Sequence, residues 1–178
     1  MSTTATARQV NRAEIVDNNF IEHVRGLRRE ALPAPKSASL SRTDLLELFD
    51  SQMASRQLDL MARVKRLENK VFYTIGSSGH EGNAMVGRLT RATDPAFLHY
   101  RSGAFMAERS RFDADTDFIR DTALSFAAAR QDPASGGRHK VWGSRPLWVV
   151  PQTSTIASHL PKAVGTALAI PHAPRIGH

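Results

Sequence analysis

The chain has 178 residues, the length of one domain, and 41% of them are hydrophobic, so we expect a single ordered core. It has no cysteine, which excludes a disulfide scaffold, a thiolate metal site and a cysteine nucleophile. A formal net charge of +7 suits an anionic partner such as nucleic acid, a phosphate compound or a membrane surface. No apolar run approaches the ~18 residues of a spanning helix, and the N-terminus has no secretory signal pattern. A cytoplasmic protein without membrane partners is therefore expected.

Residues 1–40 are predicted to form an N-terminal tail and connector, with the main domain at 41–178. Within the first part, Glu14–Arg29 is compatible with a short helix. Ala31–Ser41 is rich in Pro, Ala and Ser, and a residue that precedes proline is disfavoured in a helix. This connector is therefore expected to be extended.

The clearest helical pattern begins after Ser41. Apolar side chains recur there at steps of three and four residues, the spacing of a buried helical face: Leu46, Phe49, Met53, Leu60, Val64, Leu67 and Val71. Ser41 or Thr43 can cap the start of this helix. A break near Ser51–Ser55 is an alternative that the pattern leaves open. We expect the apolar stripe to face the core.

A glycine-rich segment, GSSGHEG at residues 76–82, leads into a second helix that should end at Thr93–Pro95. Small residues would keep this helix thin and let another backbone approach it closely: Gly82, Ala84 and Gly87. The segment does not match two catalytic motifs. The zinc-peptidase motif needs a second histidine at position 84, where this chain has alanine. The spacing of the serines and glycines also differs from the Gly-x-Ser-x-Gly elbow of hydrolases.

The rest of the chain alternates short apolar segments with helical patterns, which favours an α/β fold. A largely helical fold with a small sheet is the alternative. The predicted elements are a strand at Phe97–Tyr100, a helix at Thr116–Arg130, a mobile loop at Gln131–Arg138, a buried strand at Leu147–Val150, a polar turn at Pro151–Ser158 and a small-residue helix at Pro161–Ile170.

Two groups of polar side chains are candidates for a site. Tyr100 and Arg101 follow a predicted strand, and a phenol beside a guanidinium can hold a phosphate; a solvated sheet edge is the alternative. Ser154 and Ser158 lie in the polar turn, where they can also serve as caps for the next helix. The seven histidines show no metal-ligand spacing, so surface or hydrogen-bonding roles are expected for them.

Taken in order, four segments resemble the alpha subunit of the thiamine-diphosphate-dependent first component of 2-oxo acid dehydrogenase complexes. They are SRQLDLMARVKRLENKVFY (55–73), SSGHEGNAMVG (77–87), FLHYRSGAFM (97–106) and QTSTIASHLPKAVGTALA (152–169). The resemblance covers roughly residues 43–170. It implies the N-terminal part of a thiamine-diphosphate-binding α/β fold, helix-rich with a short parallel sheet, from a fused or a two-chain parent.

The resemblance also implies site residues. Tyr100 and Arg101 stand where the family contacts the cofactor diphosphate, and Ser154 and Ile156 where it contacts the aminopyrimidine and thiazolium. The family's Mg²⁺ ligands, in a Gly-Asp-Gly motif and a later Asn, are expected beyond His178, and its activating glutamate in the beta subunit or the second half of a fused chain. No catalytic residue and no metal ligand is therefore expected within this chain.

The implied activity is oxidative decarboxylation of a pyruvate-like or branched-chain 2-oxo acid, with transfer of the acyl group to lipoyl. The implied partners are a beta subunit or fused second half and a lipoyl acyltransferase, in an oligomer, and the chain alone should be inactive. His139 is the candidate for the histidine of the family's mobile loop. The alternative is a basic nucleic-acid-binding or scaffold domain, although the basic residues show neither aromatic interleaving nor a helix-turn-helix motif.

Overall fold

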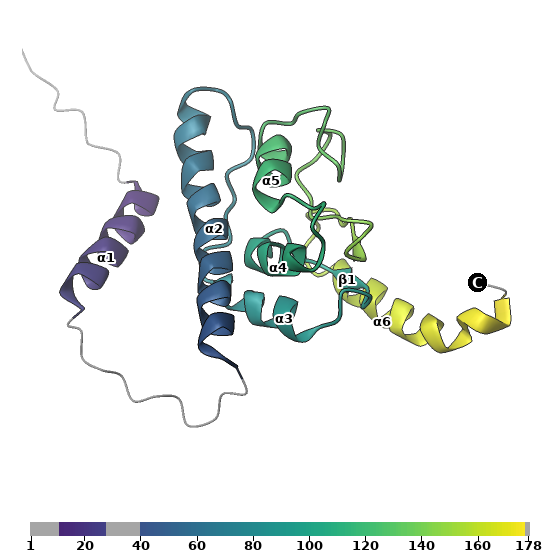
Figure 1. The fold of residues 1–178 in the computed structure, drawn as a ribbon. Coiled ribbons are helices and arrows are strands. Elements are labelled where there is room, and N and C mark those ends of the chain that lie inside the picture. The colour runs from purple at the N-terminus through teal and green to yellow at the C-terminus, as the bar shows by residue number, and fades with distance from the viewer. Residues whose placement is uncertain (1–10, 28–39, 177–178) are drawn as a thin grey trace, which may run out of the picture. The chain divides into compact units, whose positions relative to one another are not determined.

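The computed structural model describes residues 11–27 and 40–176 (Figure 1). The chain divides into two compact units, Met1–Ser39 and Leu40–His178. In the first unit, α1 (Arg12–Gly26) corresponds to the short helix predicted there. The tail and most of the predicted connector lie outside the described residues.

The second unit is helix-rich and contains a two-stranded parallel sheet, as predicted for a helix-rich α/β fold with a short parallel sheet. Its elements are α2 (Arg42–Leu67), a 3₁₀ turn (Glu81–Asn83), α3 (Ala84–Leu89), β1 (Ala96–Phe97), α4 (Gly103–Arg109), a 3₁₀ turn (Ser110–Phe112), α5 (Phe118–Phe126), β2 (Val149–Val150), α6 (His159–Ala169) and a last 3₁₀ segment (Ile170–Ile176). In the sheet, Ala96 lies opposite Val149 and Phe97 opposite Val150.

Helix α4 is the centre of the core, and every one of its residues is buried. It packs against α2, α3 and α5 (Figure 1). The main apolar cluster joins α4 and α5 to the sheet through Phe105, Met106, Ala107, Phe118, Leu147 and Val149. Two charged α4 residues are also buried: Glu108 pairs with Arg88, and Arg109 donates to the carbonyl oxygen of Asp94. These contacts offset part of the cost of burying the two charges, although Arg109 Nε makes no hydrogen bond among the described residues.

Helix α2 confirms the predicted start and corrects the predicted face. Ser41 forms a capping box with Asp44, and the helix continues without a break through Ser51–Ser55. The expected buried stripe is wrong for most of its length. The side chains that α2 buries are Leu48, Ser51, Ser55, Asp59 and Ala62, while Leu46 and Phe49 are each 60% exposed and Leu67 is 86% exposed. Of the predicted stripe, Val71 is buried, just after the helix, and Met53 and Leu60 are half-buried. Periodicity reports an apolar stripe, but it cannot show that hydrogen bonds make the polar side suitable for burial.

The thin helix expected near residue 84 is confirmed in α3. A Cβ atom on Gly87 would lie 2.9 Å from the carbonyl oxygen of Phe105 in α4, and Ala84 is fully buried. The expectation was wrong for Gly82, which has nothing within 4 Å of such an atom. Close approach of α3 to α4 therefore depends on Ala84 and Gly87.

The predicted C-terminal elements are present but shorter or shifted. Both strands have two residues, α5 starts after the capping side chain of Asp117, and α6 begins at His159 instead of Pro161. In α6 and just after it, Val164, Leu168 and Ile170 are exposed. No helix among the described residues is long and apolar enough to cross a membrane.

Candidate functional site

The parallel pairing of β1 and β2 brings together two segments that are far apart in the sequence. Tyr100 and Arg101 lie between β1 and α4, and Ser154 lies between β2 and α6. Parallel neighbours end at the same edge of a sheet, where loops commonly form ligand sites. The structure therefore places Ser154 on the same side of the sheet as Tyr100 and Arg101.

Tyr73, which follows α2, connects these two segments. Its hydroxyl is buried and faces Ser154 without reaching hydrogen-bonding geometry. Burial raises the pKa of Tyr73, and the nearby Ser154 hydroxyl and Arg101 guanidinium partly oppose that rise. Sequence reasoning did not single out Tyr73, although it ends the first segment of the family resemblance.

Four histidines gather around the same place. The His99 ring stacks on His80 with centroids 5.7 Å apart, and it meets His159 edge-on at 5.9 Å. It also lies 3.9 Å from the Tyr100 ring, while His139 Nε2 is 2.9 Å from Ser154 Oγ. We call this set the Tyr100 cluster, and its members are Tyr73, His80, His99, Tyr100, Arg101, His139, Ser154 and His159.

Sequence analysis did not predict this gathering of imidazoles, because the four histidines are widely separated along the chain. The available signal was that His80, His99 and His159 each lie inside a segment that carries the family resemblance. In the fold, burial and then the neighbouring His80, His159 and Arg101 lower the pKa of His99. This shift favours the uncharged His99 imidazole, whose Nδ1 atom accepts a hydrogen bond from the Arg101 backbone N–H at 3.3 Å.

The cluster contains several side chains that can donate hydrogen bonds to an anion. Among the described residues Arg101 forms no ion pair, and the nearby Glu81 carboxylate accepts a hydrogen bond from the Gly79 N–H. Ser158 Oγ is buried and makes no hydrogen bond, so the capping alternative does not describe this serine. A guanidinium, phenols, imidazoles and hydroxyls form a donor set suited to phosphate oxygens.

Donors of these types can contact phosphate oxygens, including those of a diphosphate. Within residues 11–27 and 40–176, no group of three His, Asp or Glu side chains is placed to hold a metal. The fourth predicted residue, Ile156, is 76% exposed, and the structure does not bring it into the cluster. Its contact with the cofactor stays a prediction.

A loop behind the cluster is tied down by a buried carboxylate. Asp132 accepts hydrogen bonds from Ala134 N at 3.0 Å and Ser135 Oγ at 2.6 Å, so the segment expected to be mobile contains an ordered turn. At its end, the Lys140 ammonium lies 3.2 Å from the Trp142 ring centroid. Burial lowers the pKa of Lys140 to about 7, against the attraction of Asp59 and Asp132.

No protein-family model matches the chain, and the comparisons with curated proteins and with solved structures found no match either. The assignment of a function therefore rests on the side chains of the Tyr100 cluster and on the sequence resemblance.

Proposed function

We propose that this chain supplies the diphosphate-binding part of a thiamine-diphosphate-dependent 2-oxo acid dehydrogenase. Such an enzyme oxidatively decarboxylates a 2-oxo acid and transfers the acyl group to lipoyl. The observation that carries the proposal is the convergence of Arg101, Tyr100 and Ser154 at one edge of the sheet, together with an Arg101 guanidinium that forms no ion pair among the described residues. When bound, thiamine diphosphate supplies the carbon nucleophile for the decarboxylation.

Each residue of the cluster has a separate part in holding the cofactor. The Arg101 guanidinium provides a permanent positive charge and a planar set of donors for diphosphate oxygens. The Tyr100 hydroxyl adds a neutral donor. Ser154 is oriented by His139, whose Nε2 lies 2.9 Å from its Oγ, and this contact fixes the Ser154 hydroxyl for the heterocyclic end of the cofactor.

The remaining parts of the reaction belong to partners in this proposal. Mg²⁺ ligands and the glutamate that activates the cofactor come from a beta subunit or a fused second half, and the acyl acceptor from a lipoyl acyltransferase. This chain orients the cofactor and stabilises its charge, because the covalent chemistry belongs to the cofactor. The chain by itself is then catalytically silent.

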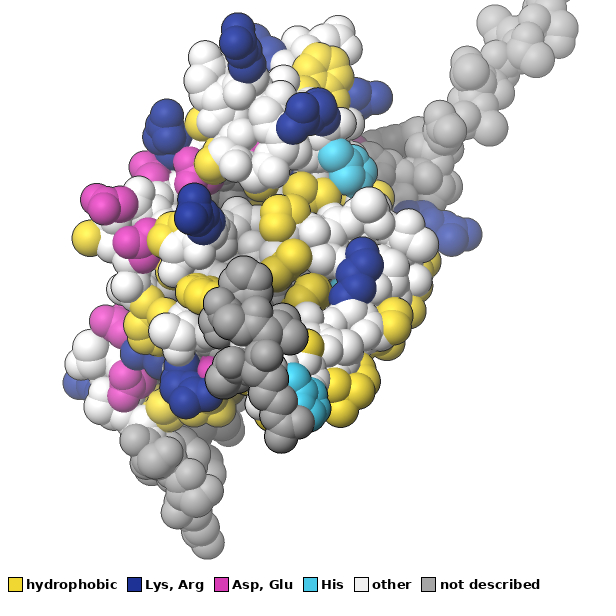
Figure 2. Space-filling model, turned by 90° about the vertical axis from the view of Figure 1, so that its right-hand side faces the viewer, with side chains coloured by type: hydrophobic (Ala, Val, Ile, Leu, Met, Phe, Trp, Pro, Cys, Tyr) yellow, Lys and Arg dark blue, Asp and Glu magenta, His cyan; other side chains and the backbone are white. Residues whose placement is uncertain are grey.

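A nucleic-acid-binding function has less support. Lys and Arg side chains are scattered among acidic and hydrophobic groups on the face shown in Figure 2. Several arginines are already committed to carboxylates, among them Arg88, which pairs with Asp44 and Glu47. Steep salt-dependent binding to duplex DNA would favour this alternative.

Chemical-shift mapping tests the proposal. The purified chain is titrated with thiamine diphosphate, and with thiamine as the control that lacks the diphosphate. We expect the ring signals of His80, His99 and His159 to move with thiamine diphosphate and to stay in place with thiamine. Identical responses to both compounds, or changes only outside the Tyr100 cluster, would contradict the proposal.

A further inference from the structure

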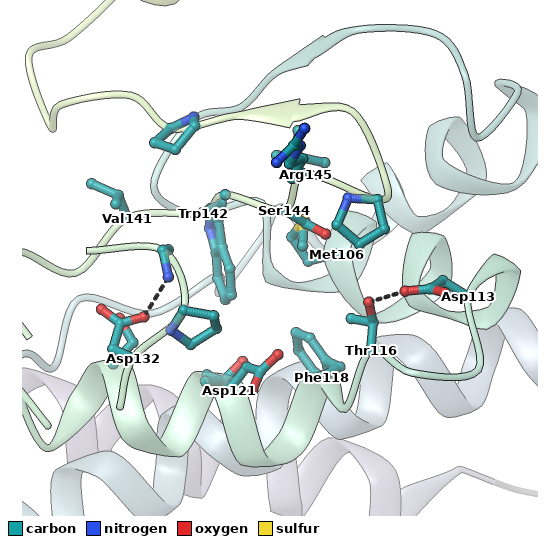
Figure 3. A pocket seen from close by; sticks show the side chains of 18 of the residues that line it. Met106, Asp113, Thr116, Phe118, Asp121, Asp132, Val141, Trp142, Ser144 and Arg145 are labelled. Atoms are coloured by element: carbon teal, nitrogen blue, oxygen red, sulfur yellow. Dashed lines mark hydrogen bonds between the residues drawn. The ribbon is translucent and has the colours of Figure 1, made fainter. Parts of the chain in front are cut away.

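A cavity lies outside the Tyr100 cluster, between α5 and the chain on either side of β2 (Figure 3). Its volume is about 810 Å³, within the range of small-molecule sites. Trp142 belongs to both places: its ring lines the cavity, and its Nε1 donates to the Tyr100 carbonyl at 3.0 Å. The proposed cofactor function assigns no role to this cavity.

The walls of the cavity are largely apolar, with an aromatic pair at the centre. Phe118 of α5 and Trp142 face each other, with ring centroids 6.1 Å apart and an interplanar angle of 24°. Figure 3 shows Phe118 pointing from α5 towards the Trp142 ring on the opposite wall. The Trp142 N–H is bonded to Tyr100, and the Lys140 ammonium lies 3.2 Å from the Trp142 ring centroid. The indole therefore offers a ligand the apolar surface that these two contacts leave.

The charge of the cavity is negative, in contrast to the net charge of the whole chain. Asp113, Asp115, Asp121 and Asp132 line it, with Arg145 as the one cation among the lining residues. Two of these carboxylates are engaged locally, because Asp113 accepts from Thr116 Oγ1 and Asp132 holds its own loop. A cavity of one sign with low-dielectric walls concentrates ligands of the opposite sign.

Asp115 and Asp121 are the two carboxylates that remain; Asp115 is exposed, whereas Asp121 is half-buried on α5. Asp121 forms a long ion pair of 3.4 Å with Arg120, the preceding residue. Burial raises the pKa of Asp121, Arg120 opposes the rise, and the charges of Asp117 and Asp132 add to it. A positive ligand group beside Asp121 would relieve this unfavourable environment.

An unsatisfied hydroxyl lies one helical turn from Asp121. Ser125 also lines the cavity, is 8% exposed, and its buried Oγ atom makes no hydrogen bond within the described residues. Side chains four residues apart share one face of a helix, so Asp121 and Ser125 present a carboxylate and a hydroxyl side by side. Both can accept hydrogen bonds from an ammonium group.

We propose that this cavity binds an organic amine with an aromatic or apolar body. The ammonium group is held by Asp121 and Ser125, and the body lies against Phe118 and Trp142. The buried unpaired hydroxyl and the aromatic wall set this place apart from an acidic surface patch. The negative charge of the cavity and its aromatic wall together favour a ligand with an ammonium group and an apolar body.

Ligand-observed NMR tests the proposal with tryptamine as the probe and indole-3-acetate as a matched compound of opposite charge. We expect tryptamine to bind at least tenfold more tightly than indole-3-acetate. Asp121→Asn should reduce tryptamine binding at least tenfold and remove the discrimination between the two compounds. Ser125→Ala should reduce tryptamine binding severalfold.

Glu68→Gln is the matched control, because it removes one negative charge at the exposed end of α2. It should leave tryptamine binding unchanged, and thermal unfolding of all variants checks that each is folded. Equal binding of the two indole compounds, failure of tryptamine to bind, or binding that survives Asp121→Asn would overturn the proposal.

Discussion

The indole N–H of Trp142 donates a hydrogen bond to the carbonyl oxygen of Tyr100 at 3.0 Å. This bond links the chain after the Asp132 turn to the segment that carries the predicted diphosphate ligands. The apolar ring of the same indole forms part of the wall of the acidic cavity. The Trp142 side chain thus contacts both the segment that carries Tyr100 and the acidic cavity.

Removal of Arg101 should weaken anion binding without affecting the fold. Arg101→Ala should lower the affinity for inorganic pyrophosphate by about 1.5–3 kcal/mol, the range for a hydrogen bond to a charged group, or roughly 10- to 150-fold. Arg101→Lys should give an intermediate loss, because the charge stays and the planar donor set is lost. Calorimetric titration measures each affinity.

Arg91→Ala is the control for this series, since the Arg91 side chain is 83% exposed and pairs with Asp94 in its own turn. It should leave pyrophosphate binding unchanged. Equal losses in the Arg91 and Arg101 variants would mean that the effect is one of net charge, and an unchanged affinity in Arg101→Ala would remove Arg101 from the site.

The sequence predicted well the features that depend on local chemistry. Ser41 is a helix cap because its hydroxyl and the Asp44 carboxylate are three residues apart, and Gly87 marks a close contact because it has no Cβ atom. Features that depend on distant partners were missed. Ser51 is buried on α2 because it donates to Glu108 Oε2 at 2.7 Å, and no local pattern reveals a partner so far along the chain.

The candidate site divides in the same way. Tyr100, Arg101 and Ser154 were named from the residue types and from the family resemblance, and the sheet brings them to one edge. No shared role for the histidines was predicted from the sequence, because their proximity depends on the parallel pairing of Ala96 with Val149. The acidic cavity was not anticipated, because its walls come from short segments that follow no shared sequence pattern.

Pyrophosphate binding should strengthen as the pH falls through the titration range of histidine. The pKa of His99 lies below its ordinary value because of burial and of the neighbouring His80, His159 and Arg101, so this imidazole gains its proton at a lower pH than an ordinary histidine does. A bound anion favours the protonated ring, and the affinity therefore rises on acidification. Titrations from pH 8 to pH 5.5 should show a smaller rise for His99→Gln than for the parent chain, with pyrophosphate protonation common to both. Parallel profiles would exclude His99 from the anion site.

Lys140 should make the stability of the domain depend on pH above neutrality. Burial lowers the pKa of Lys140 from 10.5 to about 7, so between these values the unfolded chain binds more protons, and the free energy of unfolding rises with pH. Lys140→Met should remove this slope and stabilise the domain near pH 7 by about 1–4 kcal/mol, as apolar replacements of buried charges do. Urea unfolding at pH 7 and pH 9.5 measures both effects. A parent chain of equal stability at the two pH values would contradict this account of Lys140.

The contact between α3 and α4 should tolerate no added methyl group at Gly87. Gly87→Ala places a Cβ atom 2.9 Å from the Phe105 carbonyl oxygen, and overpacking of this kind costs about 1–3 kcal/mol. Gly82→Ala is the matched control, because nothing lies within 4 Å of its added atom, and its effect should stay within about 0.5 kcal/mol. Thermal unfolding measures the stability of both variants relative to the parent chain. Equal stabilities would show that α3 shifts to make room.

The central claim is that the Tyr100 cluster recognises a diphosphate. Calorimetric titration of the purified chain with thiamine diphosphate, with thiamine as the comparison, tests it most directly. The account predicts a dissociation constant for thiamine diphosphate near 1 mM, about −4 kcal/mol, at least tenfold tighter than that for thiamine. Equal affinities for the two compounds, or no detectable binding of thiamine diphosphate, would contradict it.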